Sequence, residues 1–112
     1  MDQSVYPSST DDLAAIRRDL APQTLRTFQD FGRQVFADGE IDARTKQLIA
    51  VAVAHVTQCP YCIRGHVKAA LKAGASDKQI MEAIWVAAEM RAGGAFAHSL
   101  LALDEIRKQR GA

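Results

Sequence analysis

The chain has no long hydrophobic run and no excess of charge of either sign. Its longest apolar stretch, 48–56, is interrupted by His55 and is far shorter than the about 20 residues that span a bilayer. Lys and Arg number 14 against 13 Asp and Glu, so the net charge is +1 and no overall field attracts nucleic acid or an anionic membrane. We therefore expect neither nucleic acid nor a membrane as a partner.

The polar N-terminus shows no basic segment followed by an apolar one, so we expect no secretory signal. We expect a cytoplasmic protein whose thiols are mainly reduced. Residues 1–9 are Ser-rich, contain Pro7 and show no apolar periodicity, which predicts a flexible N-terminal arm. The composition, with 48% hydrophobic and 24% charged residues, is that of a folded protein, and we expect residues 10–112 to form a single domain.

No segment has the pattern of a β-strand, and prolines, glycines and capping residues divide the chain into helices instead. Pro22 and Pro60 suit first helical positions, and Ser76-Asp77-Lys78-Gln79 is a capping-box sequence. The pair Gly93-Gly94 is expected to interrupt or bend the helical chain, with a last helix after it. We predict an all-α fold of about six helices, within residues 10–20, 22–39, 42–57, 60–74, 76–92 and 95–108.

Alanine is abundant in the middle helices, where it allows close helix approach but supplies little buried area. A domain of this kind is expected to share its core with copies of itself, so we predict a homo-oligomer. The alanines concerned are Ala50, Ala52, Ala54, Ala69, Ala70, Ala83, Ala87 and Ala88.

The two cysteines of the chain stand three positions apart, in Cys59-Pro60-Tyr61-Cys62. Pro60 places Cys59 near a helix N-cap and Cys62 about one turn inside, where unpaired backbone N–H groups stabilise a thiolate and lower its pKa. One sulfur can attack a substrate and the other can resolve the product into an internal disulfide. His66 follows Cys62 by four residues on the same helix face, within reach as a proton acceptor or relay.

Other interpretations of the cysteine pair are weaker. A zinc site would use Cys59, Cys62, His66 and His55, but only three of these ligands are clustered. Passive core thiols rarely stand beside a proline at a helix start. Haem attachment is excluded because Ile63 occupies the position of the required histidine, and no strand pattern precedes the motif as in a thioredoxin fold. Redox-active thiols are therefore the leading interpretation.

The stretch 43–66, ARTKQLIAVAVAHVTQCPYCIRGH, followed by KAALKAGAS, resembles the carboxymuconolactone decarboxylase superfamily. Its CxxC-x3-H motif is similar to that of the alkylhydroperoxidase AhpD-like branch, and the likeness covers about residues 25–103. The resemblance implies an all-helical fold assembled into homotrimers or homohexamers. It also implies thiol-dependent peroxidase or disulfide-reductase activity, with Cys59 and Cys62 as the redox pair and His66 in a proton relay.

One position departs from that branch. The peroxidase pattern has a glutamate twelve residues before the first cysteine, where this chain has Gln47, which cannot titrate. His55 shares a broad helix face with Gln47 and is the candidate substitute in the relay. Tyr61, Trp85 and His98 are candidate pocket residues, although a packing role is the simpler interpretation, in the core for Trp85.

We therefore expect a thiol-dependent oxidoreductase that reduces disulfides or peroxides, organic hydroperoxides in particular, without a cofactor or metal. An external protein or small thiol is expected to reduce the Cys59–Cys62 disulfide. Spacing to His66 favours Cys62 as the attacking sulfur and the helix end favours Cys59, so both orders stay open. The alternatives are a lyase or small-molecule binder of the decarboxylase type and a zinc-binding structural module.

Overall fold

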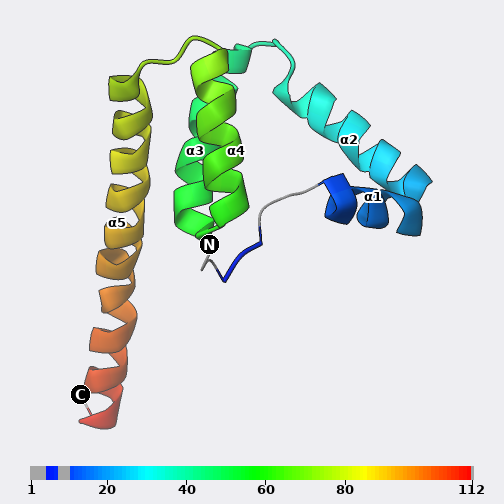
Figure 1. Cartoon of the computed structure of the whole chain (residues 1–112). Helices are drawn as coiled ribbons and strands as arrows, with labels where there is room; N and C mark the ends of the chain where they lie inside the picture. The colour runs from blue at the N-terminus through cyan, green and yellow to red at the C-terminus, as the bar shows by residue number, and fades with distance from the viewer. Residues whose placement is uncertain (1–4, 8–10, 112) are drawn as a thin grey trace. The chain divides into compact units, whose positions relative to one another are not determined.

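The computed structural model describes residues 5–7 and 11–111. These residues form five α-helices and no strand: α1 (Asp11–Leu20), α2 (Pro22–Phe36), α3 (Ala43–Thr57), α4 (Pro60–Lys72) and α5 (Asp77–Gln109) (Figure 1). The all-α prediction is confirmed for this part of the chain, whereas the predicted number of about six helices is wrong. Residues 1–4 and 8–9 of the predicted N-terminal arm lie outside the described residues. None of the helices described is long and apolar enough to cross a membrane.

The number of helices differs because α5 continues without a break through Gly93 and Gly94. A glycine inside a helix costs about 1 kcal/mol relative to alanine, but the backbone hydrogen bonds of the helix need no side chain. Alanine and other good helix formers stand on both sides of the pair. The two glycines are also half-buried, so part of this weak segment is shielded from water.

The chain forms two compact units, Met1–Ala43 and Arg44–Ala112. In the first unit, Pro22 opens α2 as predicted, and none of the residues of α2 is buried. The second unit contains α3, α4 and α5, together with both cysteines and all three histidines. The prediction of a single domain stays a prediction.

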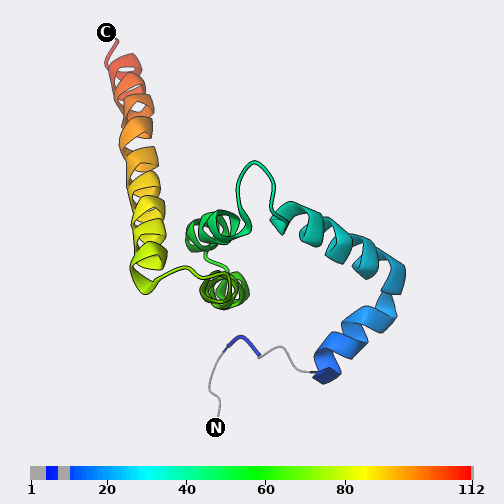
Figure 2. The same ribbon diagram turned by 90° about the horizontal axis from the view of Figure 1, so that it is seen from above.

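The core of the second unit is small and aliphatic. It consists of the buried residues Val51, Ala70, Ala75 and Ile80, and Leu48, Val67 and Ile84 pack against it. Figures 1 and 2 show α3 and α4 side by side. In Figure 2 these two helices are seen end-on, whereas α5 is seen from the side. The core therefore joins the α3–α4 pair to the first turns of α5, which crosses that pair at an angle.

A tight turn connects α4 to α5. Gly74 ends α4 with a φ of 96°, a left-handed conformation that glycine adopts without strain. Ser76 then caps α5, since its Oγ accepts from the Gln79 N–H at 3.1 Å and the Gln79 Oε1 accepts from the Ser76 N–H at 3.0 Å. The predicted capping box is confirmed, and it starts α5 one turn before the buried Ile80.

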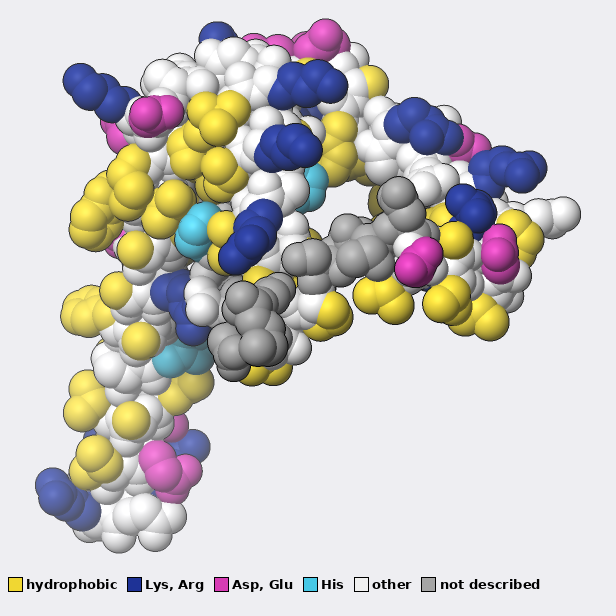
Figure 3. All heavy atoms as spheres, viewed as in Figure 1, with side chains coloured by type: hydrophobic (Ala, Val, Ile, Leu, Met, Phe, Trp, Pro, Cys, Tyr) yellow, Lys and Arg dark blue, Asp and Glu magenta, His cyan; other side chains and the backbone are white. Residues whose placement is uncertain are grey.

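Much of α5 extends beyond its neighbours. Its 33 residues give it a length of about 50 Å, against about 22 Å for the 15 residues of α3. Figure 3 shows hydrophobic side chains along its whole length, and Phe96 is 77% exposed. Such side chains are the kind that an oligomer would cover, and the predicted homo-oligomer stays a prediction.

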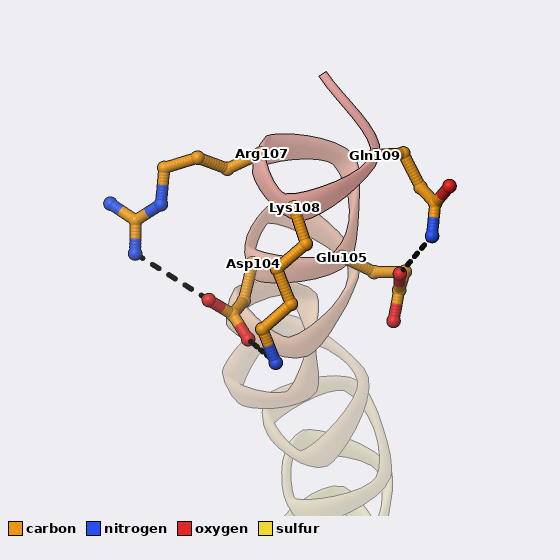
Figure 4. A network of polar contacts seen from close by, with 5 residues as sticks. All are labelled: Asp104, Glu105, Arg107, Lys108 and Gln109. Atoms are coloured by element: carbon orange, nitrogen blue, oxygen red, sulfur yellow. Dashed lines mark hydrogen bonds and ion pairs between the residues drawn. The ribbon is translucent and has the colours of Figure 1, made fainter. Parts of the chain in front are cut away.

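Polar contacts support the last turns of α5 (Figure 4). Asp104 forms ion pairs with Arg107 at 3.5 Å and Lys108 at 3.1 Å, and the Gln109 amide donates to Glu105 at 2.8 Å. These exposed pairs at intervals of three and four contribute less than about 1 kcal/mol each. They nevertheless stabilise a helix end whose side chains are not buried.

Candidate redox site

The turn between α3 and α4 positions the first cysteine. Gln58 has a φ of 58°, a left-handed conformation that is unfavourable for a residue with a side chain. The Cys59 N–H donates to the Ala54 carbonyl at 3.2 Å, and the Gln58 side-chain amide donates to the His55 carbonyl at 2.6 Å. These bonds satisfy carbonyls at the end of α3 and let the chain reverse within a few residues. Cys59 is thereby held directly at the start of α4.

Cys59 is the N-cap of α4, as its place before Pro60 predicts. Its backbone is extended, with φ −100° and ψ 104°, and Pro60 begins the helix. The Cys62 N–H donates to the Cys59 Sγ at 3.3 Å. The sulfur therefore occupies the position that a serine or aspartate oxygen takes at most helix starts. Both cysteines are free thiols and half-buried.

The two thiols differ in acidity. Hydrogen bonds from the Cys62 thiol and then from the Cys62 backbone N–H lower the pKa of Cys59 below its ordinary value. The hydrogen bond to Cys59 raises the pKa of Cys62, and burial raises it further. The resting pair thus favours a thiolate on Cys59 and a proton on Cys62, which gives physical support to Cys59 as the attacking sulfur.

This difference predicts a pH dependence of alkylation, because only the thiolate reacts. In the native protein, iodoacetamide modification of Cys59 should reach half of its maximal rate at a lower pH than modification of Cys62. Mass spectrometry of the two labelled positions measures each rate. In urea the two midpoints should coincide, and coincident midpoints in the native protein would contradict the assignment.

His66 is held by a contact between helices. Its Nδ1 lies 2.8 Å from the Gln47 Oε1, which joins α4 to α3, and both residues are half-buried. Because an amide oxygen only accepts, Nδ1 donates and carries the proton in the neutral ring. The proton-accepting nitrogen of neutral His66 is then Nε2. His66 also lies one turn after Cys62 on α4. The structure therefore brings Gln47 of α3 to the helix that carries His66 and the cysteine pair.

His55, the other predicted relay residue, makes a contact within its own helix. Its Nδ1 donates to the Val51 carbonyl at 2.7 Å. The histidine that the Gln47 side chain contacts is His66, on α4, and not His55. No group of three or more His, Cys, Asp or Glu among the described residues is arranged to hold a metal ion, which gives the zinc interpretation no support.

All three candidate pocket residues are exposed, and His98 also lines a groove. Tyr61 is 48% exposed on α4. Trp85 is 66% exposed, so the core position expected for it is wrong. Ile80 and Ala87 define the buried side of α5, and Trp85 is turned away from that side. The His98 Nδ1 donates to the Gly94 carbonyl at 2.7 Å, and His98 lines a groove instead of the cysteine pair.

That groove is a feature that sequence reasoning missed. It lies between α3 and α5, has a volume of about 670 Å³ and is mostly apolar. Val53 and Val56 line it from α3, and Val86 and Met90 from α5. Arg91, on its wall, donates to the Val56 carbonyl at 3.2 Å. Because Val56 is three residues before Cys59, the groove runs along the end of α3 that leads to the sulfur. The three-residue spacing of Val53 and Val56 on α3 is the sequence pattern that could have indicated this apolar face.

The candidate site is therefore a CxxC pair at the start of a helix, within an all-helical unit. Residues 22–105, most of the chain, match the model of the carboxymuconolactone decarboxylase family. The chain belongs to this family.

The chain is also similar to individual relatives. It is 68% identical over 82 residues to the "uncharacterized protein 4 in cox locus" of Paracoccus denitrificans, covering 70% of this chain and 74% of that protein. A carboxymuconolactone decarboxylase family protein of Legionella pneumophila superposes with a TM-score of 0.68 at 29% identity, covering 87% of each chain. A family protein of Thermotoga maritima, described as "possibly involved in antioxidative response", gives 0.55 at 26% identity over 74% of this chain and 95% of that one.

Proposed function

We propose that the protein is a thiol-dependent oxidoreductase of the AhpD-like type, which reduces hydroperoxides or disulfides through Cys59 and Cys62. The observation that carries this proposal is the N-cap position of the Cys59 sulfur, with the Cys62 N–H at 3.3 Å and a lowered pKa. The antioxidative description of the Thermotoga maritima relative supports the same chemistry.

The first step is attack by the Cys59 thiolate on the outer oxygen of a hydroperoxide. The O–O bond breaks, Cys59 becomes a sulfenic acid, and the alkoxide leaves and takes a proton to become an alcohol. The sulfur loses two electrons, which the peroxide gains. The helix start stabilises the thiolate beforehand, which favours this step.

The second step forms the internal disulfide. Of the causes that raise the pKa of Cys62, the hydrogen bond to Cys59 is lost once Cys59 has reacted, but burial remains and makes a base useful for the attack by this thiol. His66, one turn along α4 and fixed by Gln47, accepts the proton at Nε2. Cys62 then attacks the Cys59 sulfur, and the sulfenic oxygen leaves as water after protonation. An external dithiol returns the pair to two thiols.

Substrate preference follows from the apolar groove between α3 and α5. Its wall includes Val53, Val56 and Met90, and it runs toward the turn that holds Cys59. Burial of an organic group against such a wall stabilises the bound substrate by about 25 cal/mol per Å². This supports organic hydroperoxides over hydrogen peroxide as substrates.

A peroxide pulse tests the proposal. Reduced protein treated with one equivalent of cumene hydroperoxide should lose both of its two thiols and two hydrogens in mass, without a disulfide-linked dimer. Dithiothreitol should restore both thiols, and hydrogen peroxide should react more slowly. Retention of both thiols at a large excess of peroxide would refute the proposal. Lactone decarboxylation that survives the double Cys59→Ser, Cys62→Ser change would favour the decarboxylase alternative.

A further inference from the structure

One side of α4 carries positive charge without compensation. Arg64, Lys68 and Lys72 follow one another at intervals of four residues and are all exposed. The sequence of α4, PYCIRGHVKAALK, contains no acidic residue. None of the three cations forms an ion pair with a described residue. Figure 3 shows dark-blue side chains one above another over α4.

A shallow groove runs beside this row of cations. Its volume is about 460 Å³, and its lining combines apolar Ile63, Val67 and Leu71 with Arg64 and Lys68. Ile63 and Val67 are half-buried, and Leu71 is exposed. The groove therefore offers an apolar floor and a cationic edge along the same helix, which is the arrangement that an acidic amphipathic segment complements.

The groove leads to the sulfur site. Cys59, Ile63 and Val67 are spaced four residues apart and so lie along one line of the helix surface. The Ile63 N–H donates to the Cys59 carbonyl at 2.9 Å, which places the first groove residue one helical turn from the cap. A protein segment lying in the groove would thus have its end at the cysteine pair.

We propose that this α4 groove binds an acidic protein that carries the dithiol for reducing the Cys59–Cys62 disulfide. The inference rests on the proposed function, since it concerns the regeneration of the same pair. Charge complementarity selects the partner: three uncompensated cations favour an acidic surface and disfavour a basic one. Steering of this kind raises association rates by about 10-fold to 1000-fold at low ionic strength.

The electron transfer itself is ordinary thiol–disulfide exchange. A thiolate of the donor attacks one sulfur of the Cys59–Cys62 disulfide and expels the other as a thiolate. The second donor thiol attacks the resulting mixed disulfide and releases the remaining sulfur. Two electrons and two protons pass from the donor to this protein, and the donor leaves as a disulfide.

Two synthetic dithiol peptides test the proposal. Both have the same central CxxC sequence and leucines, and the flanking charged positions are Glu in one and Lys in the other. With the oxidised protein at low salt, the acidic peptide should reduce the disulfide at least about tenfold faster than the basic peptide. The difference should shrink as salt is raised to about 1 M, where the Debye length is about 3 Å. Equal rates at low salt would overturn the proposal.

A triple charge reversal locates the surface. In the Arg64→Glu, Lys68→Glu, Lys72→Glu variant, the preference for the acidic peptide should disappear or reverse. The matched control reverses three exposed cations elsewhere in the same unit, in Arg44→Glu, Lys78→Glu, Arg110→Glu, and should keep the preference. An equal loss in both variants would show a general field effect and refute docking on α4.

Dithiothreitol separates this proposal from the proposed function. It has no charged groups besides its reacting thiolate, so charge reversal should change its rate much less than the rate of the acidic peptide, which also shows that the site is intact. If charge reversal disturbs folding, the Arg64→Gln, Lys68→Gln, Lys72→Gln variant should still lower the rate with the acidic peptide alone. Failure of the peptide preference, with peroxide-driven disulfide formation intact, refutes the docking surface and leaves the oxidoreductase proposal standing. Failure of disulfide formation refutes the oxidoreductase.

Discussion

Replacing Cys59 with serine should lower peroxide turnover at least about a hundredfold, because a serine hydroxyl is not ionised at neutral pH and is a poor nucleophile. The fold should survive, since serine is among the preferred N-cap residues and its oxygen can accept the Cys62 N–H in place of the sulfur. The measurement is turnover of cumene hydroperoxide with excess dithiothreitol. A helix content and melting temperature close to those of the wild type would show that the loss is chemical.

Cys62→Ser is the matched variant for this test. It should retain the first attack but stop before the internal disulfide. With dithionitrobenzoate, the wild type should release two nitrothiobenzoate ions per chain, and Cys62→Ser one, leaving a stable adduct on Cys59. If Cys59→Ser instead reacts rapidly and Cys62→Ser does not, the roles of the two sulfurs are reversed and the spacing argument for Cys62 as attacker is correct.

His66→Asn should slow the second release of nitrothiobenzoate by about a hundredfold or more and leave the first release nearly unchanged. The first release reports attack by Cys59, and the second reports attack by Cys62, a half-buried thiol whose deprotonation a base would assist. Gln47→Ala should slow the second release less, by about tenfold, because it removes the contact that orients His66 and not the imidazole itself. Stopped-flow absorbance resolves the two phases. Equal slowing of both phases would contradict the assignment of His66 to Cys62.

Gln47→Glu supplies a readout that a merely structural role would not change. A carboxylate beside His66 favours the charged imidazolium, so a higher pH is needed before the ring can accept a proton. The second phase should therefore rise with pH later in this variant than in the wild type, while the first phase keeps its profile. Identical profiles for both proteins would show that Gln47 has no influence on the proton acceptor.

The features that were predicted correctly are those that depend on neighbouring residues. Pro60 marks the start of α4 and Ser76 with Gln79 the start of α5, because a cap is formed within one turn. Gly93-Gly94 was misjudged because the cost of glycine is local and a long run of good helix formers exceeds it. Trp85 was misjudged because α5 has apolar residues on all sides, so its sequence does not indicate which side is buried.

The candidate site likewise combines relations within one helix, which the sequence predicts, with contacts between helices, which it does not predict. His66 could be related to Cys62 by counting along one helix. Its bond to Gln47 spans 19 residues and depends on how α3 packs against α4, which helical periodicity does not specify. Counting along α3 pointed to His55 as the companion of Gln47, whereas the His55 ring bonds to its own helix. The α3–α5 groove likewise needs two helices to exist and could not be read from either alone.

The N-cap role of Cys59 gives a single sulfur atom both an architectural and a chemical duty. Folding alone would accept Ser, Thr, Asn or Asp at this position, since each supplies an oxygen for the first turn of the helix. None of these four residues could replace the thiolate as the nucleophile. Alanine would remove both the helix cap and the nucleophile. It would abolish the reaction and also lower the stability by about 1 kcal/mol. Tolerance to substitution at position 59 therefore separates what the scaffold requires from what the reaction requires.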